Sequence, residues 1–129
     1  MIYGIGTDVV EVVRIKESIE KYGDKLAKKI LTDEEMIAYK SSTLKENFLA
    51  KRFAAKEAFS KALGTGFRMN LNFKDIEVVN DKKGKPYYVK NKKITKIVQN
   101  KFKIKNFNSF LSITDEKDYS TAFTIIQSS

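Results

Sequence analysis

Glu57 and Lys61 stand out in the longest helix that the sequence predicts, residues 44–63. That segment is rich in alanine, contains no glycine or proline, and is followed by Gly64, which is typical of a helix end. At about 100° per residue, both charged side chains fall on a face that is otherwise small and apolar. The other residues of that face are Ala50, Phe53, Ala54 and Gly64. A carboxylate at such a place is costly unless it is paired or binds a metal.

Two interpretations of this pair stay open at this level. Glu57 and Lys61 have the spacing and order of an ordinary helical ion pair, which contributes about 0.2–0.5 kcal/mol. Alternatively, Glu57 binds a metal ion and Lys61 binds a phosphate. The turn Gly64-Thr65-Gly66 adds weak support to the second interpretation. Glycines let a backbone approach a ligand closely, and the N–H groups of such a turn can bind anions.

Asp8 is a third candidate, near the end of the strand-like segment 2–10. Gly4 and Gly6 share its face of the strand and leave space beside it. The ordinary interpretation is a cap or turn at the strand end, and the alternative is a part in the same phosphate site. The chain has no cysteine and no histidine, which excludes disulfides, imidazole bases and most zinc sites. Any metal must be bound by oxygen, which favours Mg²⁺, Mn²⁺ or Ca²⁺.

The length and composition predict a single domain. The chain has 129 residues, of which 42% are hydrophobic, so one domain spanning 1–129 can bury its own core. We see no secretory leader and no run of about 20 apolar residues. We therefore expect a soluble, cytoplasmic protein that has no membrane contact.

The basic charge is concentrated in one segment. The formal net charge is +9, and residues 82–105 contain ten lysines and no acid. Such a segment suits an anionic partner, or it is a solvated, lysine-rich surface with no partner. A basic nucleic-acid-binding module is therefore an alternative function. The chain carries no signature of a known module, however, and its aromatics are not interleaved with arginines.

The elements that must position these residues follow from hydrophobic periodicity and turn residues. The expected strands are 2–10, 74–80, 86–90, 109–114 and 119–126. The expected helices are 13–30, with a bend or break at Gly23, 32–40, 44–63 and 92–102. Thr32 and Glu35 have the spacing of a capping box at the start of the second helix. Helices cluster in the first half and strands mostly in the second, so the predicted class is α+β.

Two long motifs make the sequence resemble a known family. GIGTDVVEVVRI (4–15) and RFAAKEAFSKALGTG (52–66) resemble the signatures of the 4′-phosphopantetheinyl transferases, in particular the short holo-acyl-carrier-protein synthase type. Three further segments are similar to the same family in the same order. They are KILTDEEM (29–36), GKPYYV (84–89) and SFLSITDEKDYSTAFTII (109–126). The resemblance covers essentially the whole chain, and motifs of this length are specific.

The resemblance implies both an activity and a fold. The fold is an antiparallel sheet packed with a long central helix. The family transfers 4′-phosphopantetheine from coenzyme A to a serine of apo-acyl carrier protein and releases adenosine 3′,5′-bisphosphate, usually in fatty-acid synthesis. Asp8 and Glu57 match the ligands of Mg²⁺, and Lys61 matches the lysine near the pyrophosphate. Arg52, Gly64 and Pro86 match positions near the nucleotide. The base that takes the serine proton stays open between a carboxylate and a metal-bound water.

The resemblance also implies partners. Arg14 matches the position at which the family docks its acidic carrier protein. Lys21, Lys25 and Lys28 extend a basic stripe from Arg14 along the predicted helix 13–30, and such a stripe would steer and orient an acidic partner. Short members of the family act as homotrimers with sites between subunits. We therefore expect a homotrimer that binds coenzyme A and an acyl carrier protein, and no nucleic acid.

The chain departs from the family at two places. Asp115 stands where many members have a histidine near the nucleotide, and an acid there would face phosphates. The lysine-rich residues 90–105 resemble the family least and are expected to form an insertion-like helix. Because of Asp115, a catalytically impaired scaffold of the same fold remains an alternative.

Overall fold

A long helix lying against one face of a three-stranded sheet organises the molecule. The computed structural model describes residues 1–129. Its elements, in chain order, are β1 (Ile2–Glu11), α1 (Val12–Tyr22), α2 (Lys25–Ile30), α3 (Asp33–Ser41), α4 (Lys45–Leu63), the short 3₁₀ helix η1 (Phe73–Asp75), β2 (Val78–Asn80), β3 (Pro86–Tyr88), α5 (Lys92–Phe102), β4 (Phe107–Asp115) and β5 (Tyr119–Ser128).

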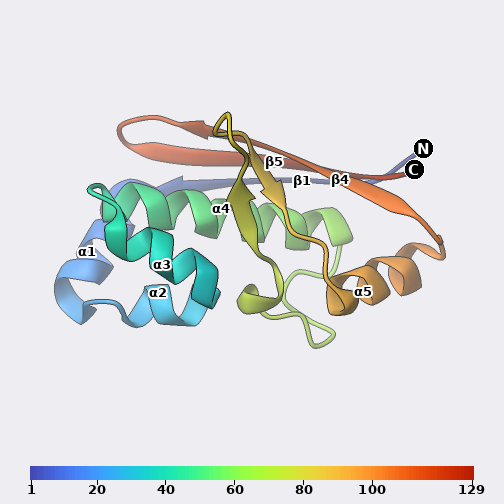
Figure 1. Ribbon diagram of the computed structural model, residues 1–129, viewed down its shortest axis with the longest axis horizontal. Coiled ribbons are helices and arrows are strands. Elements are labelled where there is room, and N and C mark those ends of the chain that lie inside the picture. Colours follow the sequence, from blue (N-terminus) through green and yellow to red (C-terminus); the bar gives the residue numbers. More distant parts are fainter.

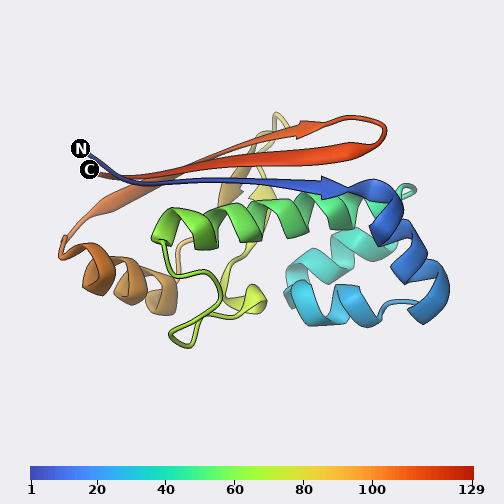
Figure 2. The same cartoon turned by 180° about the vertical axis from the view of Figure 1, so that it is seen from behind.

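The main sheet is antiparallel, with the strand order β1-β5-β4, and β2 and β3 form a separate hairpin. Helix α4 runs along one face of the main sheet (Figure 1). Helices α1, α2 and α3 gather at one end of α4, and α5 lies near its other end (Figure 2). No helix covers the opposite face of the sheet. This arrangement is the predicted α+β fold, with the antiparallel sheet packed on a long central helix.

Gly4 and Gly6 allow β1 and α4 to touch backbone to backbone. A Cβ atom added at Gly4 would lie 1.9 Å from the carbonyl oxygen of Ala62, and one added at Gly6 would lie 1.9 Å from that of Ala58. No side chain fits at that distance, so both positions require glycine. The two glycines therefore set the spacing between the strand that carries Asp8 and the helix that carries Glu57.

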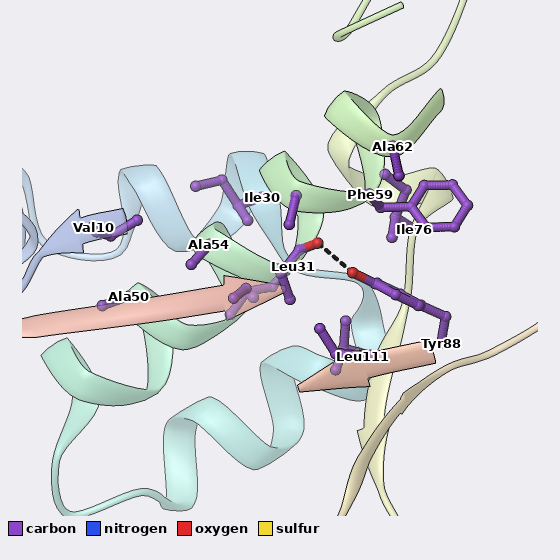
Figure 3. Close-up of a cluster of buried hydrophobic side chains, with 14 of the residues drawn as sticks. Val10, Ile30, Leu31, Ala50, Ala54, Phe59, Ala62, Ile76, Tyr88 and Leu111 are labelled. Atoms are coloured by element: carbon purple, nitrogen blue, oxygen red, sulfur yellow. Dashed lines mark hydrogen bonds between the residues drawn. The ribbon is translucent and has the colours of Figure 1, made fainter. Parts of the chain in front are cut away.

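The core surrounds α4 and is closed by the main sheet, the β2–β3 hairpin and residues of α2, α3 and α5 (Figure 3). Tyr88 of β3 is buried in this core, and its hydroxyl group forms hydrogen bonds there. The Tyr88 hydroxyl donates a 2.6 Å hydrogen bond to the carbonyl oxygen of Ala55, and it shares another of 2.6 Å with the Thr124 hydroxyl. The hairpin is thereby tied to both α4 and β5.

Most of the predicted elements are confirmed. Gly23, at φ 65°, divides the predicted helix 13–30 into α1 and α2. Thr32 and Glu35 form the capping box of α3, and Gly64 caps α4 with φ 78°. Strand 74–80 is the exception, because residues 73–75 form η1 and only 78–80 are extended. The Asp75 carboxylate accepts a 2.8 Å bond from the Asn72 backbone and pairs with Lys93, which stabilises a turn there.

The uncovered face of the main sheet is apolar at several positions. Ile5 and Val9 of β1, Phe110 of β4 and Phe123 of β5 are 40–60% exposed there. Cross-strand partners place them together, since Ile5 and Phe110 both lie opposite Ile125. None of the helices has the length and apolar character that crossing a membrane requires.

Candidate active site

Asp8, Glu57 and Lys61 come together where β1 passes over α4. Asp8 lies on the face of β1 that packs against the helix, and its side chain is 14% exposed. The Lys61 Nζ donates a 3.0 Å hydrogen bond to Asp8 Oδ1. Lys61 thus forms its ion pair with Asp8 on the neighbouring strand and not with Glu57, four residues before it. The simple helical ion pair is therefore the wrong interpretation of Glu57 and Lys61.

The two carboxylates of this cluster are not fully neutralised. Burial raises the pKa of Asp8, and the hydrogen bond from Lys61 only partly opposes that rise. The pKa of Glu57 is also raised, first by burial and then by the negative charge of Asp8, against a smaller opposing effect of Lys61. One exposed lysine serves two carboxylates, so an additional cation would be favourable here.

The donor set fits a magnesium ion better than most other metals. Asp8 and Glu57 offer only oxygen, and the structure gathers no third acid, cysteine or histidine around them. Mg²⁺ is usually held in this way, by one or two carboxylates together with waters and substrate phosphates, whereas Ca²⁺ takes more protein ligands. Asp8 and Glu57 could therefore hold Mg²⁺ once a phosphorylated ligand is present.

A groove of about 500 Å³ leads away from Asp8. Its walls come mostly from β1 and the start of α1, and they include Asp8 and Arg14. Phe53 of α4 and Tyr119 of β5 complete the lining. Sequence reasoning singled out Asp8 and Arg14 but missed the two aromatic residues, because nothing local to either sequence position marks them as neighbours of Asp8.

Arg52 and Pro86 meet in a different pocket, on the other side of α4. This second pocket has a volume of about 170 Å³ and is lined by Lys51, Arg52, Asn80, Gly84, Pro86, Ile113 and Asp115. Arg52 and Glu57 point about 140° apart, since five helical residues turn the chain by about 500°. The two places also lie at opposite edges of the sheet, because Asp8 belongs to β1 and Asp115 to β4.

Gly64, the third residue expected near the nucleotide, lies in neither pocket. It ends α4, and the side chain of Lys101 passes nearby, with Cε 3.9 Å from where a Cβ of Gly64 would be. The predicted residues are therefore divided into three parts. Asp8, Glu57 and Lys61 form one cluster, Arg52 and Pro86 form another with Asp115, and Gly64 stands beside α5.

Asp115 is paired with a residue that the sequence did not single out. Its Oδ2 lies 3.7 Å from the Nζ of Lys51, and its Oδ1 accepts a 3.1 Å hydrogen bond from the Ser120 hydroxyl. Both members of the pair are about one-third exposed at the rim of the second pocket. The acid therefore does not face that pocket as an unpaired charge.

The basic stripe is divided between two helices, in keeping with the predicted break at Gly23. Arg14 and Lys21 are exposed on α1, whereas Lys25 and Lys28 are exposed on α2, beyond the break at Gly23. Arg14 pairs with Glu11 at 3.2 Å. Lys21 and Lys25 lie over the exposed ring of Tyr22, 5.3 and 5.7 Å from its centre. The result is a basic surface with an aromatic residue in it, formed by two helices.

Nearly the whole chain matches the sequence model of one family. The sequence model of the 4′-phosphopantetheinyl transferase superfamily matches residues 4–124. This chain belongs to that superfamily. All the residues of both pockets and of the Asp8 cluster lie within the matched range.

Several relatives and solved structures in the superfamily match this chain along almost their full length. A holo-[acyl-carrier-protein] synthase of Pelagibacter ubique is 56% identical over 126 residues, which are 98% of this chain and 97% of that protein. The crystal structure of the holo-[acyl-carrier-protein] synthase of Neisseria meningitidis has a TM-score of 0.88 and 41% identity, covering 98% of this chain and 99% of that one. A Bacillus anthracis holo-(acyl-carrier-protein) synthase in complex with CoA (3′,5′-ADP) has a TM-score of 0.79 and 36% identity, covering 100% and 99%.

Proposed function

We propose that this chain is a holo-acyl-carrier-protein synthase with its catalytic centre at Asp8, Glu57 and Lys61. It transfers 4′-phosphopantetheine from coenzyme A to a serine of apo-acyl carrier protein and releases adenosine 3′,5′-bisphosphate. The observation that carries the proposal is the Asp8–Glu57–Lys61 cluster, in which one lysine serves two partly buried carboxylates. The full-length match to synthases of this activity supports it.

The chain's own residues have distinct parts in the transfer. The serine oxygen attacks the phosphorus that carries the pantetheine arm, and the bond from that phosphorus to the oxygen of the leaving nucleotide breaks. The serine proton passes to a base at the site, which is either a carboxylate or a water. Lys61 is 53% exposed, so its ammonium can turn from Asp8 to the phosphates and offset the charge that gathers on the leaving oxygen. Asp8 and Glu57 would hold Mg²⁺, and the ion would supply positive charge next to the pyrophosphate.

The division of the predicted residues supports a site that two subunits share. Asp8 lies on one edge strand of the sheet, and the pocket of Arg52, Pro86 and Asp115 lies beside the other edge strand. Identical subunits that meet through two different surfaces form a ring when the rotation between them closes. In a homotrimer of this kind, the Arg52 pocket of one subunit would complete the Asp8 cluster of the next. The apolar, uncovered sheet face supports such an assembly.

The basic surface of α1 and α2 supports docking of an acidic carrier protein. Arg14 belongs both to this surface and to the groove that begins at Asp8. A carrier bound across Arg14, Lys21, Lys25 and Lys28 would therefore have a path for its serine along the groove. Complementary charge of this kind speeds encounter and sets orientation.

The decisive experiment combines the purified protein with coenzyme A, Mg²⁺ and apo-acyl carrier protein. We expect intact-mass spectrometry to detect one added phosphopantetheinyl group on the carrier and none when Mg²⁺ is removed. A carrier whose mass does not change at any enzyme concentration would contradict the proposal.

Mixing two inactive variants tests the shared site. Arg52→Ala alters the half of the shared site at the second pocket, and Glu57→Gln alters the half at the Asp8 cluster. In a ring that contains both variants, some interfaces join an unaltered second pocket to an unaltered Asp8 cluster. We expect part of the activity to return after the two variants exchange subunits. Mixtures that stay as inactive as their components would show that each site lies within one chain.

A further inference from the structure

Glu35 is a buried carboxylate that joins three segments of the chain. Its side chain is fully buried. Its Oε1 accepts hydrogen bonds from the Lys56 Nζ at 2.6 Å and from the Thr32 backbone N–H at 2.9 Å, and its Oε2 accepts one from the Val78 N–H at 3.1 Å. These donors belong to α4, to the cap of α3 and to β2. The position of the carboxylate is therefore fixed by independent elements.

Lys56 is fully occupied within this cluster and has no donor left for a ligand. Besides Glu35, its ammonium donates to the carbonyl oxygens of Ile30 at 2.7 Å and Phe73 at 3.1 Å. An ammonium has three donors, so all of them are used. The role of Lys56 is structural.

Arg52 differs from Lys56, because its guanidinium is held but not satisfied. The Arg52 Nε lies 3.5 Å from Glu35 Oε2, and the guanidinium carbon lies 4.5 Å from the centre of the Phe48 ring. The residue is 5% exposed, and its buried Nε has no hydrogen-bond partner. The side chain lines the second pocket, beside Lys51 and Pro86. Glu35 and Phe48 thus hold the guanidinium while its remaining donors stay available to the pocket.

The unsatisfied donors of Arg52 favour an anion in that pocket. Glu35 is the carboxylate paired with both Lys56 and Arg52. The partly buried Glu77, which accepts a 2.6 Å hydrogen bond from the Thr32 hydroxyl, adds a second negative charge near Lys56. Lys51 and Asp115 at the rim offset each other. A buried guanidinium that lacks a full complement of hydrogen bonds is costly, and a phosphate oxygen would supply the missing acceptors.

We propose that Glu35 is a positioning residue that orients the Arg52 guanidinium toward a phosphate group at the nucleotide end of coenzyme A. The proposal rests on the function proposed above, since it assigns the second pocket to that ligand. Glu35 acts from behind Arg52 and touches neither coenzyme A nor the reacting atoms. Its loss therefore weakens coenzyme A binding and leaves the rate at saturating coenzyme A nearly unchanged.

The test compares Glu35→Asp with Arg52→Ala and with the double variant. Aspartate keeps the charge but withdraws the carboxylate by one methylene. We expect Glu35→Asp to raise both the Kd for coenzyme A in calorimetry and the KM in carrier modification about tenfold, the effect of losing one charge-assisted hydrogen bond. We expect kcat to change by less than about threefold, because the Asp8 cluster is untouched. In the Arg52→Ala background, Glu35→Asp should change the Kd by less than about twofold.

Two further variants separate positioning from folding. Thr32→Val removes the α3 cap beside Glu35 but leaves the carboxylate and Arg52, so it should melt earlier and bind coenzyme A as the unaltered protein does. Glu35→Gln/Lys56→Met removes one buried anion together with one buried cation. If Glu35→Asp does not fold, this double variant takes its place in the test, and we expect it to bind coenzyme A more weakly than the unaltered protein does.

The possible outcomes are distinct. If Glu35→Asp bound coenzyme A like the unaltered protein, or weakened Arg52→Ala by the same factor as it weakens the unaltered protein, the positioning role would be wrong while the proposed function stood. If Thr32→Val weakened binding equally, the effect would be one of general stability and the role would again be wrong. An unaltered protein that bound no coenzyme A would overturn both.

Discussion

Helix α4 carries two clusters of acids and bases, and they differ in how completely their charges are satisfied. On one side, Glu35 is buried with Lys56 and Arg52, and its oxygens accept bonds from three segments. On the other side, Asp8 and Glu57 share the exposed Lys61. Lys56 and Glu57 are adjacent in the sequence, yet one belongs to each cluster.

The comparison separates residues that maintain the fold from residues that are free to bind. In a buried cluster whose hydrogen bonds are nearly all formed, replacing a single partner lowers the stability of the fold, because it leaves an unpaired charge buried. A partly exposed cluster with raised carboxyl pKa values costs little to rearrange and is improved by an added cation. Ionisable groups whose pKa values are shifted, as those of Asp8 and Glu57 are, concentrate at functional sites.

The largest expected effect is the loss of activity in Glu57→Gln. The substitution keeps the shape of the side chain and removes one of the two charges that would hold Mg²⁺. We expect the rate of carrier modification to fall about 10³-fold, as it does when a main electrostatic contribution to a transition state is removed. Circular dichroism should record an unchanged fold. Activity near that of the unaltered protein would remove Glu57 from the catalytic centre.

The same substitution made in both clusters gives the sharpest comparison. Lys56→Met breaks a buried pair, and we expect it to lower the free energy of unfolding by about 3 kcal/mol or more. Lys61→Met breaks an exposed pair, and we expect a cost of about 1 kcal/mol or less. Their effects on turnover should be reversed, with folded Lys56→Met active and Lys61→Met nearly inactive. Urea unfolding measures the loss of stability in each variant, and the carrier assay measures its turnover. Equal destabilisation by Lys56→Met and Lys61→Met would contradict the distinction between the two clusters.

A smaller effect should be visible in the pH dependence of stability. Because the pKa of Glu57 is raised above its ordinary value of 4.5, the folded protein binds that proton more tightly than the unfolded chain does. The stability that Glu57 contributes is present below pH 4.5 and is lost as the pH rises through the folded-state pKa.

Glu57→Gln should therefore raise the melting temperature of the metal-free protein at pH 7 by a few degrees, and the difference from the unaltered protein should shrink toward pH 4. In the presence of coenzyme A, adding Mg²⁺ should further stabilise the unaltered protein and not the variant, because only the former has both ligands. Melting curves over this pH range measure both effects. A variant that is less stable than the unaltered protein at pH 7 without metal would contradict the expectation.

The smallest expected effect concerns Lys51 and Asp115. Their pair is separated by 3.7 Å and partly exposed, so Asp115→Asn should change the free energy of unfolding by about 0.5 kcal/mol or less. The variant leaves Lys51 without its partner and makes the second pocket more positive. We expect coenzyme A to bind slightly more tightly in calorimetry, whereas weaker binding would mean that Asp115 itself contacts the ligand.

Several parts of this fold could be predicted from the sequence, because they depend only on residues that are close together along the chain. The capping box of Thr32 and Glu35, the break at Gly23 and the end of α4 at Gly64 all follow from backbone preferences of the residues themselves. Residues 74–77 show the limit. They have the apolar pattern of a strand, but the bonds of Asp75 to Asn72 and Lys93 favour a turn, and the second of these depends on a distant helix.

Glu35 shows the same limit within the candidate sites. The sequence indicated that it closes a helix cap, which it does with one oxygen. Nothing local indicated that Lys56, Val78 and Arg52 would also approach it, because they lie 17 to 43 residues away along the chain and meet it only when α4 and β2 pack. Lys51 escaped notice for a similar reason, since its partner Asp115 is on the last hairpin.

For Asp8, Glu57 and Lys61, the sequence by itself determined which side chains are candidates and which kinds of metal they could bind. With no histidine or cysteine in the chain, only oxygen could bind a metal, and the two long motifs identified which carboxylates and which lysine to consider. Only the tertiary structure decided that Lys61 pairs with Asp8 rather than with its own helical neighbour, and that Arg52 and Pro86 lie beside the opposite edge of the sheet. Side-chain type and helical period are properties of the local chain, whereas these pairings depend on how closely Gly4 and Gly6 let β1 approach α4.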